Sequence, residues 1–345
     1  MALGSRGKTV IGILSVLVLL GGAFIGYRLL TREAGEPIID IPLVNDEPDP
    51  CPLTGLEADD ESVLDRRVLA VKIENSPEAR PQMGLAEADV IYEQEAEGGI
   101  SRFIALFHCR DADRVGPIRS ARPVDPDVLR QYGDPLFVHA GSVDAVINAV
   151  EDAGIEMINC NFEEETCPRD DSREAPHDVF TSTDALRDFG GENGEAPADV
   201  FAFDEEIPEE ARRGRQLNLN FSPVANVFWK YRNNRDFYLR FHDDTLHRLE
   251  DGSPVTAANV VVMLVDRETT RITDSAGNPV PNFDVFGRGD LLVFRNGRVI
   301  EGEWRRQSPN EVTQLLDRRG EEIPLVPGQT WVELFPTDAP APPSF

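Results

Sequence analysis

The stretch DVIYEQEAEGGISRFIALFHC, residues 89–109, decides the fold of the first half of the chain. Its two ends, 89–95 and 100–109, are rich in β-branched and aromatic residues, which favour extended backbone. Gly98-Gly99 stands between them and is typical of a turn. The stretch therefore predicts two strands separated by a turn.

The residues around this stretch alternate between strand and helix patterns. The β-branched run 68–73 predicts a strand, and the polar loop 74–82, broken by Pro, follows it. Further along, Ser142 is placed to cap a helix whose apolar residues recur at helical spacing. Strands that interleave with helices predict an α/β or α+β domain over residues 51–189. Its remaining predicted elements are a helix at 125–132, a strand at 136–139 and a helix at 142–153.

The second half of the chain differs from the first in composition and in hydrophobic pattern. Residues 190–214 are rich in Gly, Pro and acids and predict a linker. Residues 215–336 contain short β-type runs separated by Asp-Gly, Gly-Asn and Asn-Gly turn signals, which predicts a mostly β domain. The Pro-rich tail 337–345 is expected to be frayed. The β-type runs are 224–231, 237–241, 260–265, 291–294 and 331–335.

The N-terminus contains a candidate membrane anchor. Val10 to Tyr27 carries no charge, and at about 1.5 Å per residue it covers most of a hydrocarbon core roughly 30 Å thick. A cleavable signal peptide is disfavoured because no small-x-small site follows Ile25. We expect residues 1–30 to form a cytoplasmic tip and a single transmembrane helix that contacts the membrane through residues 10–30. The Pro-rich, acidic stretch 31–50 is predicted to be an extended tether.

The cysteines indicate on which side of the membrane the body lies. Positive charges before and after the apolar segment are nearly balanced, so they do not decide the orientation. Cys160 and Cys167 flank a short acidic loop and predict a disulfide, and Cys51 with Cys109 is a weaker second pair. Because disulfides form mainly outside the cytosol, we expect the body to lie on the extracytoplasmic side of the plasma membrane.

The charge of the chain excludes one class of partner. The 345 residues include 62 Asp and Glu against 34 Lys and Arg, a formal net charge of -28. This charge repels polyphosphate backbones, and the cations form no dense stripe along the sequence. We therefore expect no nucleic-acid partner.

Polar residues concentrate in the loops of the first domain, where ligands usually bind. A guanidinium group binds carboxylate or phosphate through two parallel hydrogen bonds, so several loop arginines predict an anionic ligand. The alternative is a structural network in which the arginines pair with nearby acids. The candidate ligand-binding residues are Glu74, Asn75, Arg80, Glu93, Glu97, Arg102, Arg119, Arg122, His139, Arg173 and His177.

Five motifs of the first half resemble the signatures of the YerB-like family: ARPQMGLAEADVIYE (79–93), EGGISRF (97–103), VGPIRSARP (115–123), HAGS (139–142) and DSREAPHDVFTS (171–182). The family comprises extracytoplasmic bacterial proteins, often lipoproteins, long carried as a domain of unknown function. The resemblance covers residues 51 to 336, and NVVVMLVD, GRVIEGEWRR and PGQTWVELFP extend it into the second half. It implies a two-part architecture and an envelope location, but no reaction. This chain lacks the lipobox cysteine of the lipoprotein members, so a spanning helix is expected in its place.

Two classes of function follow from these features. The favoured hypothesis is an envelope binding or assembly factor whose first domain holds an anionic ligand, such as a cell-wall glycan, peptide or teichoic-type polymer. The alternative is an extracytoplasmic hydrolase or transferase that acts on the same material, with Ser120, His139, His177 and Asp171 as candidate catalytic residues. A third hypothesis makes the β half a platform that binds envelope proteins.

Metal and cofactor sites are not predicted. Asp111 and Asp113 resemble the start of a calcium loop, but Arg122 stands where the bidentate Glu is required. His242 and His247 lack the spacing of the H-E-x-x-H motif. We therefore expect neither a metal nor a cofactor.

Overall fold

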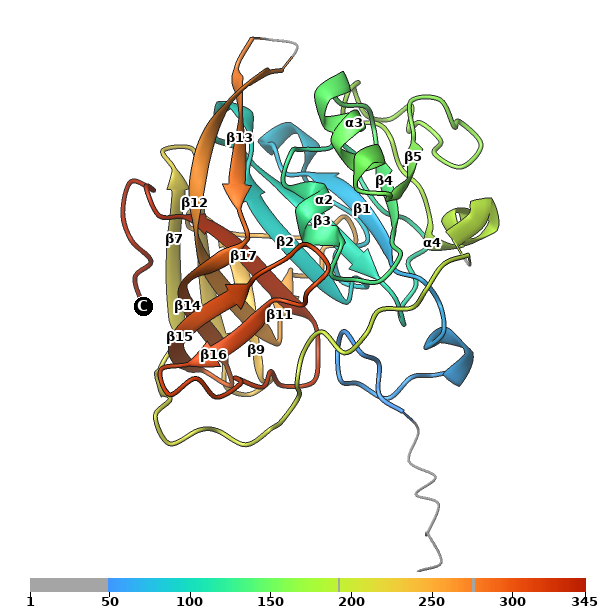
Figure 1. Ribbon diagram of the computed structural model, residues 1–345. Coiled ribbons are helices and arrows are strands. Elements are labelled where there is room, and N and C mark those ends of the chain that lie inside the picture. Colours follow the sequence, from blue (N-terminus) through green and yellow to red (C-terminus); the bar gives the residue numbers. More distant parts are fainter. Residues whose placement is uncertain (1–48, 192, 275–276) are drawn as a thin grey trace, which may run out of the picture. The chain divides into compact units, whose positions relative to one another are not determined.

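Two β-sheets build the part of the chain that the structure describes (Figure 1). The structure is a computed structural model, and it describes residues 49–191, 193–274 and 277–345. Residues 48–345 form one compact unit. Within the described residues, one sheet has twelve strands and the other has five. The predicted α/β-like first region and β-rich second region are both present.

The first region contributes one end of the large sheet, in the order β2-β3-β1-β4-β5. Strands β1, β4 and β5 run parallel, whereas β3 is antiparallel to both β1 and β2. Every residue of β1, β2 and β3 is buried, because hydrophobic clusters cover both faces of the sheet. The strands are β1 (Leu69–Glu74), β2 (Val90–Glu95), β3 (Ser101–Phe107), β4 (Leu136–His139) and β5 (Glu156–Asn159).

Short helices join these strands, and the prediction of their bounds was partly wrong. The helices are α2 (Asp125–Leu129), α3 (Asp144–Asp152) and α4 (Thr183–Leu186), together with the single turns η1 (Glu61–Val63), η2 (Pro77–Ala79), η3 (Glu97–Gly99) and η4 (Arg187–Gly191). Ser142 does not cap α3; Val143 occupies the N-cap position. The Ser142 hydroxyl instead donates to the carbonyl of Ala121, 2.9 Å away, and so ties two loops together.

The second region contributes the other end of the large sheet and all of the small one. The small sheet contains β7 (Gln216–Ser222), β8 (Ala225–Arg232), β9 (Phe237–His242), β10 (Thr245–Leu246) and β11 (Thr256–Ala257). The large sheet contains β6 (Arg212–Arg213), β12 (Asn259–Thr273), β13 (Pro279–Asp284), β14 (Gly287–Arg295), β15 (Arg298–Arg306), β16 (Gln314–Asp317) and β17 (Thr330–Pro336). β12 is longer than its predicted core at 260–265, and with β13 it forms a projecting hairpin (Figure 1).

The two regions share the large sheet through the last strand of the chain. β17 lies between β12 and β2 and runs parallel to both. The pairing with β2 extends from Thr330 opposite Val90 to Leu334 opposite Gln94. A strand from the end of the sequence is therefore hydrogen-bonded into the sheet of the first region.

The C-terminal tail is ordered, contrary to the expectation of fraying. Asn218 and Ser344 exchange two backbone hydrogen bonds of 2.8 and 3.2 Å, and the Phe345 ring packs edge-on against Phe294. These contacts hold the tail against the small sheet and the large one.

The membrane segment predicted at 10–27, like most of the tether at 31–50, lies outside the described residues. In the described ranges, no helix is long and apolar enough to cross a membrane. Both predicted disulfides are present: Cys160 is bonded to Cys167, and Cys51 is bonded to Cys109.

Candidate functional site

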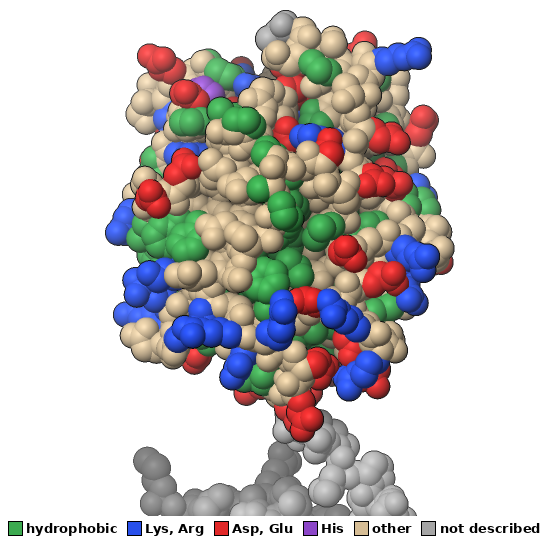
Figure 2. Space-filling model, turned by 90° about the vertical axis from the view of Figure 1, so that its left-hand side faces the viewer, with side chains coloured by type: hydrophobic (Ala, Val, Ile, Leu, Met, Phe, Trp, Pro, Cys, Tyr) green, Lys and Arg blue, Asp and Glu red, His purple; other side chains and the backbone are tan. Residues whose placement is uncertain are grey.

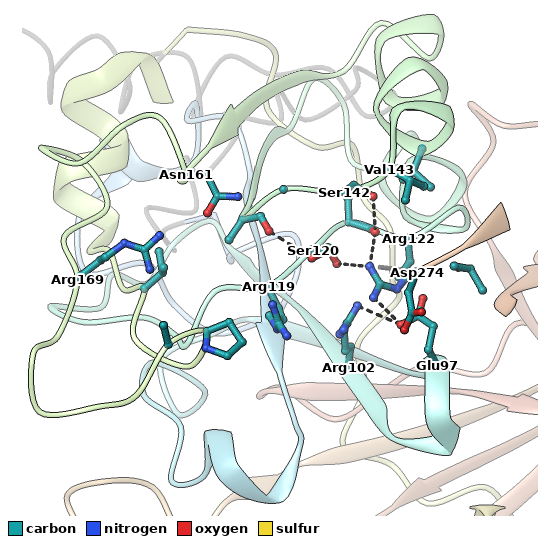
Figure 3. A pocket seen from close by; sticks show the side chains of 18 residues that line it. Glu97, Arg102, Arg119, Ser120, Arg122, Ser142, Val143, Asn161, Arg169 and Asp274 are labelled. Carbon is teal, nitrogen blue, oxygen red and sulfur yellow. Dashed lines mark hydrogen bonds and ion pairs between the residues drawn. The ribbon is translucent and has the colours of Figure 1, made fainter. Parts of the chain in front are cut away.

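A pocket of about 510 Å³ opens where several loops of the first region meet (Figure 3). Its wall includes the loop 119–122, the loop 140–143 after β4, and Asn161 after β5. The loops after β4 and β5 lie at the carboxyl ends of parallel strands, which is the usual place for a ligand in an α/β sheet. Asp274 and Val280 of the β12–β13 hairpin complete the wall, so both regions contribute to the pocket.

Three candidate residues, Glu97, Arg102 and Arg122, form the deepest part of the pocket. Each is at least nine-tenths buried. The Arg122 guanidinium binds the Glu97 carboxylate through Nη2 and donates through Nη1 to the carbonyls of Ser120 and Ala121, at 3.1 and 2.7 Å. Burial lowers the pKa of Arg122, and the negative charge of Glu97 opposes that shift. Burial also raises the pKa of Glu97. Arg122 is therefore held mainly by protein groups.

Arg102 differs from Arg122 because much of its hydrogen-bonding capacity is unused. Its Nη1 lies 3.5 Å from Glu97 Oε2, an ion-pair distance. Among the described residues, Nε and Nη1 of Arg102 are buried and have no hydrogen-bond partner. A buried guanidinium without hydrogen bonds is unfavourable unless a ligand or water supplies an acceptor. Arg102 thus offers donors to an anion in the pocket.

Arg119 joins the pocket to a second pair of candidate residues. Its Nε lies 3.1 Å from Glu74 Oε1, and His177 Nδ1 lies 2.7 Å from Glu74 Oε2. The Glu74 side chain is 2% exposed, while that of Arg119 is 25% exposed and lines the pocket. Glu74 therefore pairs with both Arg119 and His177, and it does not itself line the pocket.

Seven of the eleven candidate ligand residues do not line the pocket: besides Glu74, His139 and His177, they are Asn75, Arg80, Glu93 and Arg173. Glu93 is fully buried and binds Arg240 of the second region, while Ser101 and the amide of Asn75 also donate to it. Arg80 donates to Asn75, at 3.2 Å to Oδ1 and 2.8 Å to its carbonyl. Arg173 donates to the carbonyls of Ala79 and Pro81 and pairs with Glu250. The contacts of these residues with other protein groups agree with the alternative hypothesis stated above, in which the loop arginines belong to a structural network and not to a ligand site.

The candidate catalytic residues are not joined by hydrogen bonds. Ser120 Oγ donates to the carbonyl of Ala140, 3.2 Å away, and His139 Nδ1 lies 3.0 Å from the carbonyl of Gly141. His177 is bonded to Glu74, and Asp171 is exposed. In the part of the chain that the structure describes, no hydrogen bond connects Ser120 with either histidine. Ser120 does line the pocket, so the arrangement presents a hydroxyl to a ligand without an adjacent base.

Some residues of the pocket were missed by sequence reasoning. Asn161 and Arg169 come from the segment around the Cys160–Cys167 disulfide, which was singled out for its cysteines only. Asp274 and Val280 lie in a hairpin with no polar motif, far from the other loops in sequence. Within the described ranges, His, Cys, Asp and Glu form no group of three or more that could hold a metal ion.

Comparisons with known proteins assign the chain to a family. Residues 53–196 match the model described as "Protein of unknown function (DUF3048) N-terminal domain", and residues 217–332 match its C-terminal counterpart. The chain is 31% identical over 293 residues to "Putative lipoprotein YerB" of Bacillus subtilis (strain 168), which covers 83% of this chain and 86% of that protein. The chain belongs to the YerB-like family.

The fold is similar to that of another member of the YerB-like family. The crystal structure of the YerB protein from Bacillus subtilis superposes with a TM-score of 0.74 at 29% sequence identity. The match covers 86% of this chain and 99% of that chain. The boundary between the two family models, residues 197–216, contains the end of the predicted linker and the start of β7.

Proposed function

We propose that this YerB-like protein is a membrane-anchored, extracytoplasmic binding or assembly factor that holds an anionic ligand of the cell envelope in the pocket around Arg102. The description of the Bacillus subtilis relative as a lipoprotein supports an extracytoplasmic body attached to the membrane. The two disulfides support the same location, because such bonds persist mainly outside the cytosol.

The observation that carries the proposal is the Arg102 guanidinium, whose buried Nε and Nη1 have no hydrogen-bond partner among the described residues, although Nη1 lies 3.5 Å from Glu97 Oε2. Arg119 and Arg169 line the same wall, with side chains 25% and 47% exposed. A carboxylate or phosphate that enters the pocket would meet the buried Arg102 and these two more exposed arginines, all three of which are labelled in Figure 3. Cell-wall glycans, peptides and teichoic-type polymers all carry such groups, and they are the ligand class that we propose.

Retention of the protein on isolated cell wall tests this proposal. The full chain, purified in neutral detergent, is mixed with wall preparations, and the bound fraction is measured as wall is titrated. Arg102→Gln should weaken retention by about tenfold or more, the value of one charge-assisted hydrogen bond. Arg130→Gln is the matched control, because it removes the same charge from a half-buried side chain that contacts Asn310 and lies outside the pocket. Equal retention of the two variants and the parent chain would contradict the proposal.

A further inference from the structure

A second basic groove lies in the β-rich region and shares no residue with the pocket. It has a volume of about 410 Å³, and three arginines, Arg213, Arg215 and Arg298, line it together with Tyr231. Figure 2 shows a band of Lys and Arg side chains across the lower part of the face that β7 borders. The concentration of cations is notable because the chain as a whole carries a formal net charge of -28.

The strand register places like charges directly opposite each other in this groove. Arg298, the first residue of β15, lies across from Arg213 of β6 on one side and from Arg295 of β14 on the other. Arg295 is buried and its guanidinium donates to the carbonyls of Glu206 and Pro324, whereas Arg213 and Arg298 are exposed. Like charges directly opposite one another destabilise a strand pair. Without a bound anion, repulsion between Arg213 and Arg298 destabilises the pairing of β6 with β15.

Within the described ranges, the side chains of these groove arginines, Arg213, Arg215 and Arg298, form no ion pair and no hydrogen bond. The carboxylate that lines the groove, Asp236, accepts a hydrogen bond of 2.9 Å from the Tyr231 hydroxyl. Arg212 is the contrasting neighbour, because it forms an ion pair with Glu301.

The backbone holds the groove in a fixed shape. Asn296 and Gly297 have φ of 50° and 69° and make the two-residue turn between β14 and β15. A Cβ at Gly297 would lie 2.6 Å from the Tyr231 ring, so glycine lets the ring lie against the turn. The amide of Gly214 donates to the carbonyl of Gly297 at 3.0 Å, and the amide of Tyr231 donates to that of Arg215 at 2.9 Å. The arginines are therefore presented by connected strands and not by a mobile loop.

We infer that this groove binds the phosphate groups of a linear anionic polymer. A phosphate offers several acceptor oxygens, and one group can accept from both Arg213 and Arg298 across the strand pair. A groove accommodates a chain, and repeated phosphates along that chain can reach Arg215 as well. A flat membrane surface with anionic lipids is the competing occupant, and the test separates the two.

Binding of a fluorescently labelled linear polyphosphate to the full chain in neutral detergent, measured by anisotropy at several salt concentrations, tests the inference. Arg213→Gln and Arg298→Gln should each weaken binding by about tenfold and reduce its salt dependence, because each removes one phosphate contact. The matched control is Arg288→Gln, since the Arg288 side chain is 73% exposed and lies outside the groove. An equal loss in Arg288→Gln would overturn the inference and leave only a general charge effect.

Two further measurements decide between this role and the alternatives. Thermal unfolding of Arg213→Gln should show a melting temperature equal to or above that of the parent chain, because the substitution relieves a like-charge pair. A clear loss of stability would indicate a structural role and overturn the inference.

Vesicles containing phosphatidylglycerol are tested in parallel with polyphosphate. Binding to vesicles but not to polyphosphate would assign the groove to a membrane surface instead. Because the pocket and the groove share no residue, Arg213→Gln should weaken polyphosphate binding by the same factor in the parent chain and in an Arg102→Gln background, so failure of the pocket and failure of the groove are distinguishable.

Discussion

Arg240 and Glu93 form an ion pair that is closed to solvent on both sides. Arg240 Nη2 lies 2.7 Å from Glu93 Oε1 and 2.6 Å from Oε2, and both side chains are 0% exposed. Glu93 belongs to β2 of the first region and Arg240 to β9 of the small sheet. The rings of Phe103 and Trp331 pack against the Arg240 guanidinium, at 5.3 and 5.2 Å from its carbon. The pair therefore links the two regions inside a hydrophobic core.

Removal of one partner of this pair should destabilise the protein strongly. Glu93→Gln removes the carboxylate that pairs with the buried Arg240 and leaves Glu333, an acid beside them whose pKa burial raises, so we expect a cost of about 3 to 5 kcal/mol of unfolding free energy. Urea unfolding followed by tryptophan fluorescence measures the loss, since Trp331 lies against Arg240. The double variant Glu93→Leu with Arg240→Met should recover a large part of it. A loss below about 1 kcal/mol in Glu93→Gln would contradict a structural role for the pair.

The first region should not fold stably without β17. In a fragment that ends at residue 210, β2 becomes an edge strand although all six of its residues are buried in the intact protein. An exposed edge strand offers unpaired backbone groups to other chains, and β2 also loses the cover of its buried side chains, so the fragment is expected to aggregate. Co-expression with residues 211–345 should restore soluble protein. A monomeric fragment that unfolds cooperatively on its own would show that β17 is dispensable.

The two disulfides should differ in their contribution to stability. They close segments with sequence separations of 58 for Cys51–Cys109 and 7 for Cys160–Cys167. In the chain-entropy model, this corresponds to about 4 kcal/mol for the longer loop and about 2.5 kcal/mol for the shorter one. Paired Cys→Ala variants, compared by denaturant unfolding, measure the two values. If the Cys160/Cys167 variant lost more stability than the Cys51/Cys109 variant, loop closure would not be the main effect.

His108 should make folding sensitive to acid. Burial lowers the pKa of His108 to about 4, from a usual 6.5. As the pH falls, His108 takes up a proton in the unfolded chain before it does so in the folded chain. The stabilisation of the folded chain by a neutral His108 is therefore fully present above pH 6.5 and is lost as the pH falls toward 4. Asp89 lies close by and acts in the opposite direction, because burial raises its pKa to about 6.

A His108→Gln variant isolates this effect from other titrating groups. The difference in unfolding free energy between variant and parent should shift in favour of the variant by up to about 3 kcal/mol between pH 7 and pH 4. Denaturant unfolding of both chains at several pH values measures the difference. The pH-dependent contributions of Asp89 and the other carboxylates are common to both chains and cancel in it. A difference that does not change with pH would show that His108 keeps an ordinary pKa.

Ser120→Ala should leave wall binding unchanged within about twofold. Its hydroxyl already donates to the Ala140 carbonyl, 3.2 Å away, so it is bonded to the protein, and the net contribution of one neutral hydrogen bond is small. The same preparations are assayed for soluble wall fragments. If the parent chain released fragments and Ser120→Ala did not, the hydrolase alternative would gain over the binding function proposed above.

The sequence by itself determined the features that depend on neighbouring residues. The β-branched runs on either side of Gly98-Gly99 predicted β2 and β3, and the run at 291–294 predicted part of β14. Apolar residues at helical spacing gave α3, although local hydrogen bonding moved its start from Ser142 to Asp144. The Cys160–Cys167 pair was also predicted, because its partners are close along the chain. Ordered motifs were sufficient to recognise the family.

Only the tertiary structure decided which residues meet across long sequence separations. Glu93 and Arg102 both looked like ligand residues, yet pairing with Arg240 places Glu93 in the core, whereas Arg102 lines the pocket with donors unused. β17 looked like a strand of a separate β domain but lies between β12 and β2. Strand order and ion-pair partners depend on contacts between residues distant in sequence, and local propensity carries no information about them. Local patterns therefore identified many of the strands but not β5, β13, β15 or β16, and contacts with residues distant in sequence decide the role of each charged side chain.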